Sequence, residues 1–120
     1  MLLTILESTS ESLFLELSGS LDLAGVREIE TRFLAHTTTT TRSVVVDFSQ
    51  VTFLASCGIR MLFEAVRALS QHKRKLVILN PQPLVGRILD TGGVNTVAII
   101  VHDPYRIPPR LLAQSPAIQS

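Results

Sequence analysis

Short apolar segments separated by a polar stretch open the chain. Residues 2–6 and 13–17 are apolar segments on either side of the polar residues 7–12, and in the second segment leucines alternate with other side chains. Alternation with a period of two is typical of strands, so the pattern predicts a β-hairpin. Gly19 and Ser20 interrupt the pattern, and we expect the second strand to end before them.

A first helix is predicted after this hairpin. Asp22 is of a residue type that caps helices, and apolar residues then recur at positions i, i+3 and i+7: Val26, Ile29 and Phe33. This spacing indicates a helix over residues 23–35. The next run, residues 37–41, contains only threonine. Because threonine is β-branched and the run has no apolar face, we expect a loop there.

The middle of the chain carries the strongest signals. Residues 43–48 form an apolar run, which is the pattern of a central strand covered on both faces. After a loop, apolar residues at positions i, i+3, i+4, i+7 and i+10 predict an amphipathic helix: Ile59, Leu62, Phe63, Val66 and Leu69. Residues 75–79 then predict another buried strand.

A third helix and a last strand complete the pattern. Two prolines stop the preceding strand and favour a helix start, and two glycines are typical of the helix end. The apolar face of this helix is formed by Val85, Ile88 and Leu89. Residues 97–101 predict the last strand. Beyond residue 103, prolines leave only residues 110–114 as a candidate short helix.

The elements follow the order β β α β α β α β. Strands that alternate with helices are expected to be parallel and joined by helical crossovers, while the opening hairpin adds an antiparallel pair. The expected fold is therefore α/β, a mixed β-sheet with helices packed on it. With 120 residues, 46% of them hydrophobic, the chain has room for one domain, over residues 1–103. Residues 104–120 are expected to form a short C-terminal tail.

Composition and charge exclude several classes of function. Lys and Arg number 11 against 10 Asp and Glu, and direct nucleic-acid binding normally requires a clustered basic surface. The single cysteine cannot form an internal disulfide, and no apolar run approaches the ~20 residues of a membrane span. The histidines share no metal-ligand spacing with Cys57 or with paired carboxylates. We therefore expect no metal, no cofactor and a cytoplasmic location.

Small residues gather where the central strand leads into the strongest helix. Ala55, Ser56, Cys57 and Gly58 follow one another at this junction. Glycine in a first helical turn costs stability relative to alanine, which indicates that something approaches this backbone closely. The alternative for Ser56 is that it only caps the helix, because serine is among the best N-cap residues.

Four segments in this order and spacing resemble the STAS domains of bacterial anti-sigma factor antagonists. They are residues 19–22, 44–58, 76–81 and 88–94, and the resemblance covers about residues 2–102. In that family the loop before the second helix typically reads Asp-Ser-Ser/Thr-Gly. The serine after the aspartate is phosphorylated by a partner that is both an anti-sigma factor and a serine kinase.

The resemblance implies roles for individual residues of this chain. Ser56 would be the phosphoacceptor, Gly58 the glycine of the motif, and Asp22 the acidic residue of the family's Gly-x-Leu-Asp turn near the same surface. Ala55 and Cys57 depart from the family pattern, which has aspartate and then serine or threonine at these positions. Loss of the aspartate removes a charge beside Ser56 that bears on kinase recognition. The Cys57 thiol either responds to oxidants at the helix N-terminus or simply fills the first turn.

A phosphorylation switch follows from this resemblance. The implied partner-binding residues are Asp22, Ala55, Ser56, Cys57, Gly58, Ile59 and Arg60. The unphosphorylated protein would bind an anti-sigma factor kinase and so free a sigma factor, phosphorylation would release the kinase, and a phosphatase is a further candidate partner. The alternative is an interaction or scaffold module of the same fold that is never phosphorylated. An enzyme has little support, and monomer and weak dimer both stay open.

Overall fold

The predicted order of strands and helices is confirmed. The computed structural model describes residues 1–39 and 42–102. Along the chain these residues form β1 (Leu2–Ser8), β2 (Ser12–Leu21), α1 (Leu23–Thr38), β3 (Ser43–Leu54), α2 (Ser56–Ser70), β4 (Leu76–Leu79), α3 (Pro83–Thr91), the 3-10 turn η1 (Val94–Thr96) and β5 (Ile99–Val101). The predicted short helix over residues 110–114 lies outside the described residues.

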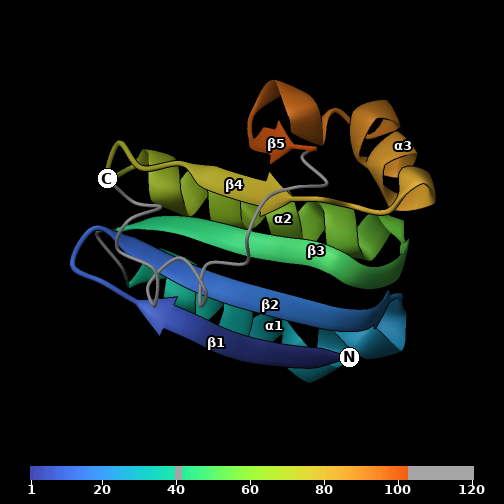
Figure 1. Cartoon of the computed structure of the whole chain (residues 1–120), viewed down its shortest axis with the longest axis horizontal. Helices are drawn as coiled ribbons and strands as arrows, with labels where there is room; N and C mark the ends of the chain where they lie inside the picture. Colours follow the sequence, from blue (N-terminus) through green and yellow to red (C-terminus); the bar gives the residue numbers. More distant parts are fainter. Residues whose placement is uncertain (40–41, 103–120) are drawn as a thin grey trace, which may run out of the picture.

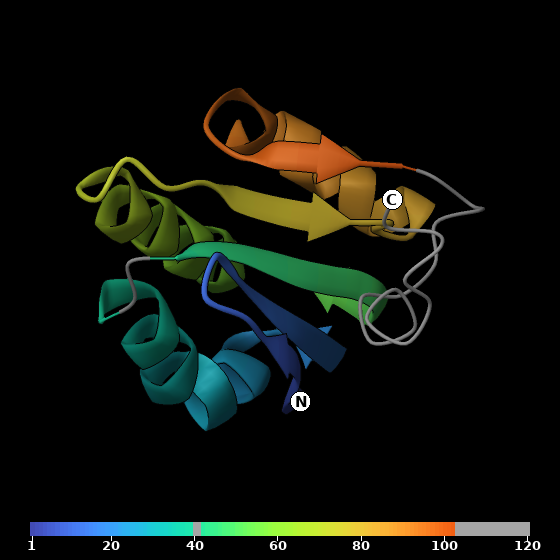
Figure 2. The same cartoon turned by 60° about the vertical axis from the view of Figure 1, so that its left-hand side comes forward.

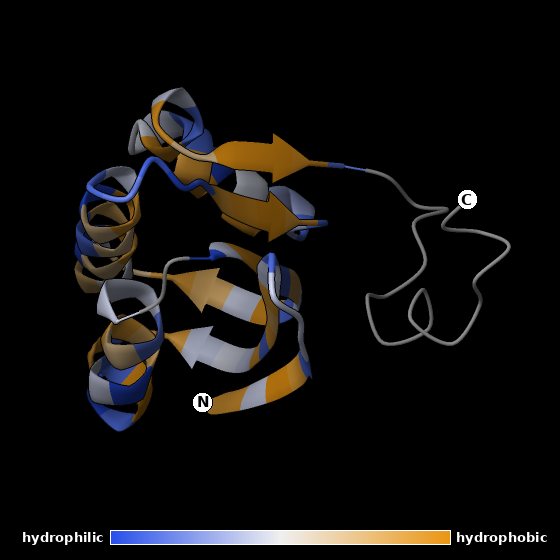
Figure 3. Ribbon diagram, turned by 90° about the vertical axis from the view of Figure 1, so that its left-hand side faces the viewer, coloured by the Kyte–Doolittle hydropathy of each residue, from blue (hydrophilic) through white to orange (hydrophobic). Residues whose placement is uncertain are grey.

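The strands form one mixed sheet in the order β1-β2-β3-β4-β5 (Figure 1). β1 is antiparallel to β2, and each later strand is parallel to the one before it. Crossovers between parallel strands are right-handed, and here each one steps to the next strand in the same direction. The helices therefore lie on one face of the sheet. Figure 2 shows α1 and α2 side by side, and Figure 3 shows both on the same side of the strands.

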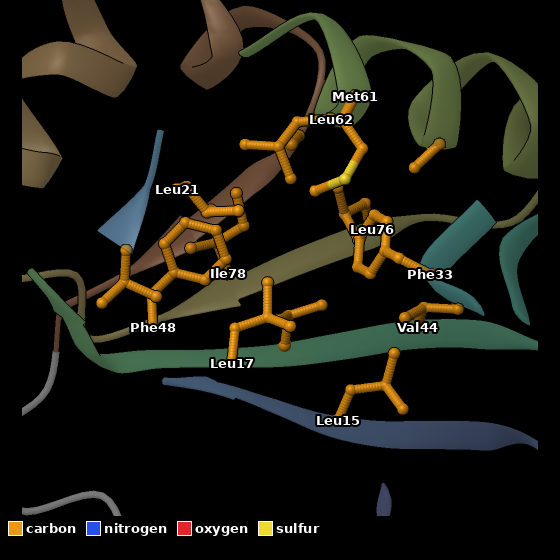
Figure 4. Packing of buried hydrophobic residues seen from close by; sticks show 14 of the residues in the cluster. Leu15, Leu17, Leu21, Phe33, Val44, Phe48, Met61, Leu62, Leu76 and Ile78 are labelled. Atoms are coloured by element: carbon orange, nitrogen blue, oxygen red, sulfur yellow. The ribbon is translucent and has the colours of Figure 1, made fainter. Parts of the chain in front are cut away.

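The core fills the space between the sheet and the helices. Over residues 12–17 of β2 and 43–48 of β3, every second side chain is buried and those between them are only partly buried. Figure 4 shows buried side chains from both layers, including Leu15, Leu17, Val44 and Phe48 from the sheet and Phe33 from α1. β3 is central, as expected, but among the described residues only its face toward the helices is fully buried, where the pattern predicted cover on both faces. The helices of the described residues cover one face only.

α1 continues beyond its predicted end because threonines extend it. The helix ends at Thr38 rather than at residue 35. The hydroxyls of Thr37 and Thr38 both donate to the carbonyl oxygen of Leu34, at 3.1 and 2.8 Å, and Thr37 is buried. Burial and these hydrogen bonds outweigh the low helix propensity of threonine. The predicted loop over residues 37–41 is therefore wrong for its first two residues.

β2 and β3 also run further than the sequence pattern indicated. β2 passes through Gly19 and Ser20 to Leu21, and β3 continues to Leu54. The register between the two strands shifts twice near this end, and Gly19 has a φ of +114°, a value that favours glycine. The strands stay paired to their ends, where Leu21 lies opposite Leu54. The helices that follow them consequently start next to each other.

Candidate functional site

The N-termini of α1 and α2 adjoin at the carboxyl edge of the sheet. β2 and β3 are parallel and both end there, and the backbone amide of Ala55 donates to the carbonyl oxygen of Leu21 at 2.9 Å. α1 begins directly after Asp22, and α2 begins directly after Ala55. Strand pairing thus brings Asp22 to the segment 55–60 that the resemblance grouped with it. This edge of a parallel sheet is where α/β proteins commonly bind their ligands.

Asp22 caps α1 at the protein surface. Its carboxylate accepts a hydrogen bond from the backbone amide of Gly25 at 2.8 Å and another from the hydroxyl of Ser20 at 3.2 Å. The Gly25 amide is the main cause of a lowered pKa of Asp22, and the Ser20 hydroxyl adds to it. The side chain is exposed. Asp22 therefore stabilises a helix and also places a fixed negative charge beside the start of α2.

Ala55, and not Ser56, is the N-cap of α2. Its backbone is extended, with φ −91° and ψ 171°, and its carbonyl oxygen accepts the amides of Gly58 and Ile59 at 3.0 and 3.1 Å. The alanine methyl cannot accept a hydrogen bond, so no side chain caps this helix. The interpretation of Ser56 as a capping serine is wrong. Within residues 1–39 and 42–102, the amides of Ser56 and Cys57 at the start of the first turn have no capping acceptor.

The Ser56 hydroxyl is exposed and has no partner among the described residues. The side chain is exposed at the first residue of α2. Within residues 1–39 and 42–102 its hydroxyl forms no hydrogen bond. Because nothing in this part of the chain uses the hydroxyl, a phosphate could be added to it without breaking an existing contact.

Cys57 and Gly58 face the protein interior. Cys57 is a free, half-buried thiol packed against the core. Gly58 is buried, and a β-carbon placed on it would lie 2.7 Å from Cδ1 of Leu54 and 3.2 Å from the carbonyl oxygen of Leu21. The close approach that the glycine indicated is thus made by the ends of the protein's own strands. Gly58 lets α2 start against the sheet.

Exposed apolar side chains lie around this edge, and the sequence analysis missed them. Leu23 is 56% exposed at the first residue of α1, Phe53 is 44% exposed at the end of β3, and Leu84 is 53% exposed in the first turn of α3. Each falls outside the apolar stripe or buried row of its own element. That off-stripe position was the signal available in the sequence, because large exposed apolar residues that gather in one place mark an interaction surface.

A shallow pocket between α2 and α3 adjoins the same edge. It has a volume of about 280 Å³ and is lined by Ile59, Leu84, Arg87, Ile88, Thr91 and Gly92. Ile59 is half-buried one turn into α2, so the pocket opens close to Ser56. Arg60 is exposed and lies one turn after Ser56, on the same side of the helix. The predicted residues therefore divide into exposed ones (Asp22, Ser56, Arg60) and ones that pack inward.

Two other kinds of site are absent from the described ranges. They hold no group of three or more His, Cys, Asp or Glu side chains able to bind a metal ion. None of their helices combines the length and apolar character needed to cross a membrane.

Comparison with known proteins relates the described domain to a family. Residues 5–102 match the family model described as "Mlab, STAS domain". An anti-sigma-B factor antagonist of Staphylococcus aureus (strain NCTC 8325 / PS 47) is 28% identical over 91 residues, covering 74% of this chain and 84% of the relative.

Solved structures show the same fold. The anti-sigma factor antagonist SpoIIAA in its unphosphorylated form superposes with a TM-score of 0.71 at 19% identity, over 85% of this chain and 90% of that one. The Bacillus cell fate determinant SpoIIAA in the phosphorylated form gives a TM-score of 0.64 at 18% identity, over 85% and 93%. Since the family model spans residues 5–102 and the strand and helix order agrees, this chain belongs to the STAS domain family.

Proposed function

We propose that this protein is an anti-sigma factor antagonist whose partner binding is controlled by phosphorylation of Ser56. The partner would be an anti-sigma factor that is also a serine kinase, and a phosphatase would restore the binding form. Support comes from the staphylococcal relative, named an anti-sigma-B factor antagonist, and from the SpoIIAA structures in unphosphorylated and phosphorylated forms. In this role the protein acts in the cytoplasm by binding, not by catalysis, and changes transcription without contacting DNA.

The environment of the Ser56 hydroxyl carries this proposal. A kinase needs a hydroxyl that it can reach and that the fold does not use. Ser56 is exposed, and capping of α2 falls to the neighbouring Ala55. The match to the family's phosphoacceptor serine and the free hydroxyl are independent observations, and both favour the same residue.

The fold should accept a phosphate at this position. The modification adds about −1.5 to −2 charges at pH 7. These charges would lie at the positive end of the α2 dipole, beside the uncapped amides of Ser56 and Cys57. Arg60, exposed one turn further along, is placed to pair with the phosphate. Phosphorylation is therefore expected to leave the free protein folded.

The effect would fall on the bound partner. The proposed partner covers Ser56 and extends over the exposed apolar side chains at the same edge, Leu23, Phe53 and Leu84, and over the pocket beside Ile59. A phosphate dianion enclosed in such a contact loses its hydration without gaining equivalent hydrogen bonds. A cost of about 3 kcal/mol weakens binding roughly a hundredfold, which is enough for a switch.

The first experiment measures modification. Wild type and Ser56→Ala are incubated with the cognate anti-sigma kinase and Mg-ATP, and their intact masses are recorded. We expect a gain of about 80 Da in the wild type only, the mass of one phosphate. An unmodified wild type, or equal labelling of both proteins, contradicts the proposal.

The second experiment measures binding to the same kinase by calorimetry. Ser56→Asp should weaken binding at least tenfold, although its single charge underestimates the phosphate. Ser10→Asp is the matched control, because Ser10 is an exposed serine in the turn between β1 and β2. It should bind as the wild type does. If the kinase binds Ser56→Asp as tightly as the wild type and phosphorylates neither protein, the result favours the alternative, an interaction or scaffold module that is never phosphorylated.

A further inference from the structure

The sheet face opposite the helices carries a row of apolar side chains. Strand register places Phe14, Val45, Val77 and Ile99 beside one another across β2 to β5. They alternate with the core residues of their strands, so they point away from the helices. Ile99 is 47% exposed and the other three are partly buried. Parallel sheets occur almost only with both faces covered, and no described helix covers this face.

Two acidic residues lie in the next row of the same face. Glu16 on β2 is the register partner of Asp47 on β3, and like charges directly opposite destabilise a sheet. Within the described residues neither forms an ion pair. One oxygen of Asp47 accepts the amide of Ser49 at 2.8 Å, and Leu79 and Val101 continue the row. An occupant of this face must combine apolar and cationic side chains.

We propose that residues 103–120 of the same chain cover this face. This segment contains apolar and cationic residues close together: Arg106, Ile107, Arg110, Leu111 and Leu112. Its single acidic residue is Asp103. A second copy of the chain stacked through this face would set another Glu16 and Asp47 against the first pair, which charge disfavours. In the proposed arrangement the arginines of this segment would offset these charges, and its leucines and isoleucines would supply the apolar side chains for the row.

The segment begins in the right place and is long enough. β5, at one side of the sheet, ends at Val101 on the carboxyl edge, and the segment follows one residue later. The 18 residues 103–120 reach at most ~60 Å when extended. The four parallel strands, spaced ~4.8 Å apart, are only ~15 Å across. The segment can therefore turn back over the whole face.

Photo-crosslinking in the full chain tests the proposal. The photoreactive amino acid p-benzoylphenylalanine replaces Phe14 on the open face, and in a control protein it replaces Phe63, which is exposed on α2. After irradiation, mass spectrometry of the digested protein identifies the partner peptide. We expect a crosslink from position 14 to residues 103–120 within one molecule, and at least severalfold less from position 63. The double variant Arg106→Glu/Arg110→Glu should reduce the position-14 crosslink severalfold, whereas Arg27→Glu on α1 should not.

Each other outcome overturns the proposal. A mixture of ¹⁴N and ¹⁵N protein separates crosslinks within a chain from those between chains, and mixed-isotope products would identify a second copy as the occupant. Absence of any crosslink between position 14 and residues 103–120 would show that this segment does not cover the face, and a different protein would then be the candidate occupant. Equal yields from positions 14 and 63, or no effect of the arginine substitutions, would show that the segment has no preference for this face.

Discussion

The Ala55→Asp substitution should stabilise the protein, because Asp22 in the same molecule shows what such a cap does. The two N-caps have closely similar backbones, with φ −90° and ψ −172° at Asp22 and φ −91° and ψ 171° at Ala55. Each is followed three residues later by a buried glycine, Gly25 or Gly58. The Asp22 carboxylate accepts the Gly25 amide at 2.8 Å. An aspartate at position 55 would offer the same side-chain acceptor to the Gly58 amide, which in the wild type donates to the Ala55 carbonyl oxygen at 3.0 Å.

The expected gain is about 1 kcal/mol, the usual difference between aspartate and alanine at an N-cap. The positive end of the helix dipole adds to it, and the nearby charge of Asp22 subtracts from it. For a domain of this size, about 1 kcal/mol raises the melting temperature by roughly 4 °C.

Urea unfolding at pH 7, followed by circular dichroism, measures this gain. Ala55→Asn supplies the same acceptor without the charge, and it should also stabilise, including at low pH. Ala35→Asp is the matched control, since Ala35 is exposed in the last turn of α1. A negative charge there opposes the dipole and should destabilise by about 0.3–1 kcal/mol. If neither Ala55 variant is more stable than the wild type, the first turn of α2 is already satisfied and the reasoning is refuted.

Neighbouring residues allow three more tests. Hydrogen bonds from Gly25 and then Ser20 lower the pKa of Asp22, so its stabilisation is complete above the unfolded-state pKa and is lost as pH falls through the folded-state pKa. The urea midpoint of the wild type should therefore fall more between pH 6 and pH 2 than that of Asp22→Asn. Gly25→Ala should cost about 3 kcal/mol, since its β-carbon would lie 2.0 Å from the Ser20 carbonyl oxygen. Gly58→Ala, which meets the movable end of a leucine, should cost about 1 kcal/mol, and the reverse order would contradict the packing. Leu84→Ala should leave the urea midpoint unchanged but weaken binding of the kinase about tenfold, and unchanged binding would remove α3 from the partner surface.

The amphipathic pattern was sufficient to predict the architecture. The stripe from Ile59 to Leu69 indicated a helix, and α2 spans Ser56–Ser70. Alternating strands and helices indicated parallel pairing, which the sheet confirms. These features depend on periodicity, because an apolar stripe repeating every 3.6 residues has one face to bury. Local pattern failed at Thr37 and Gly19, where burial and strand pairing overrode propensity.

The site was located by the sequence but interpreted incompletely. The run of small residues and the family resemblance both marked the start of α2. They could not tell whether Ser56 caps α2 or is the first residue of the helix with its hydroxyl unused. That distinction depends on the hydrogen bond from the amide of Ala55 to Leu21, a residue 34 positions earlier, which helps fix where the helix begins. No local spacing reveals a contact of this range.

The sequence by itself thus determined the order of elements, the family and the segment that carries the candidate switch, since these depend on periodicity and on residue identity. Only the tertiary structure decided which residues face out. Strand pairing set Asp22 beside α2, buried Gly58 against Leu21 and left the Ser56 hydroxyl exposed. Crossovers of one hand, stepping in one direction, placed the described helices on a single face of the sheet. The reason is that the exposure of a side chain depends on which other elements pack against it, and the sequence of one segment does not specify these neighbours.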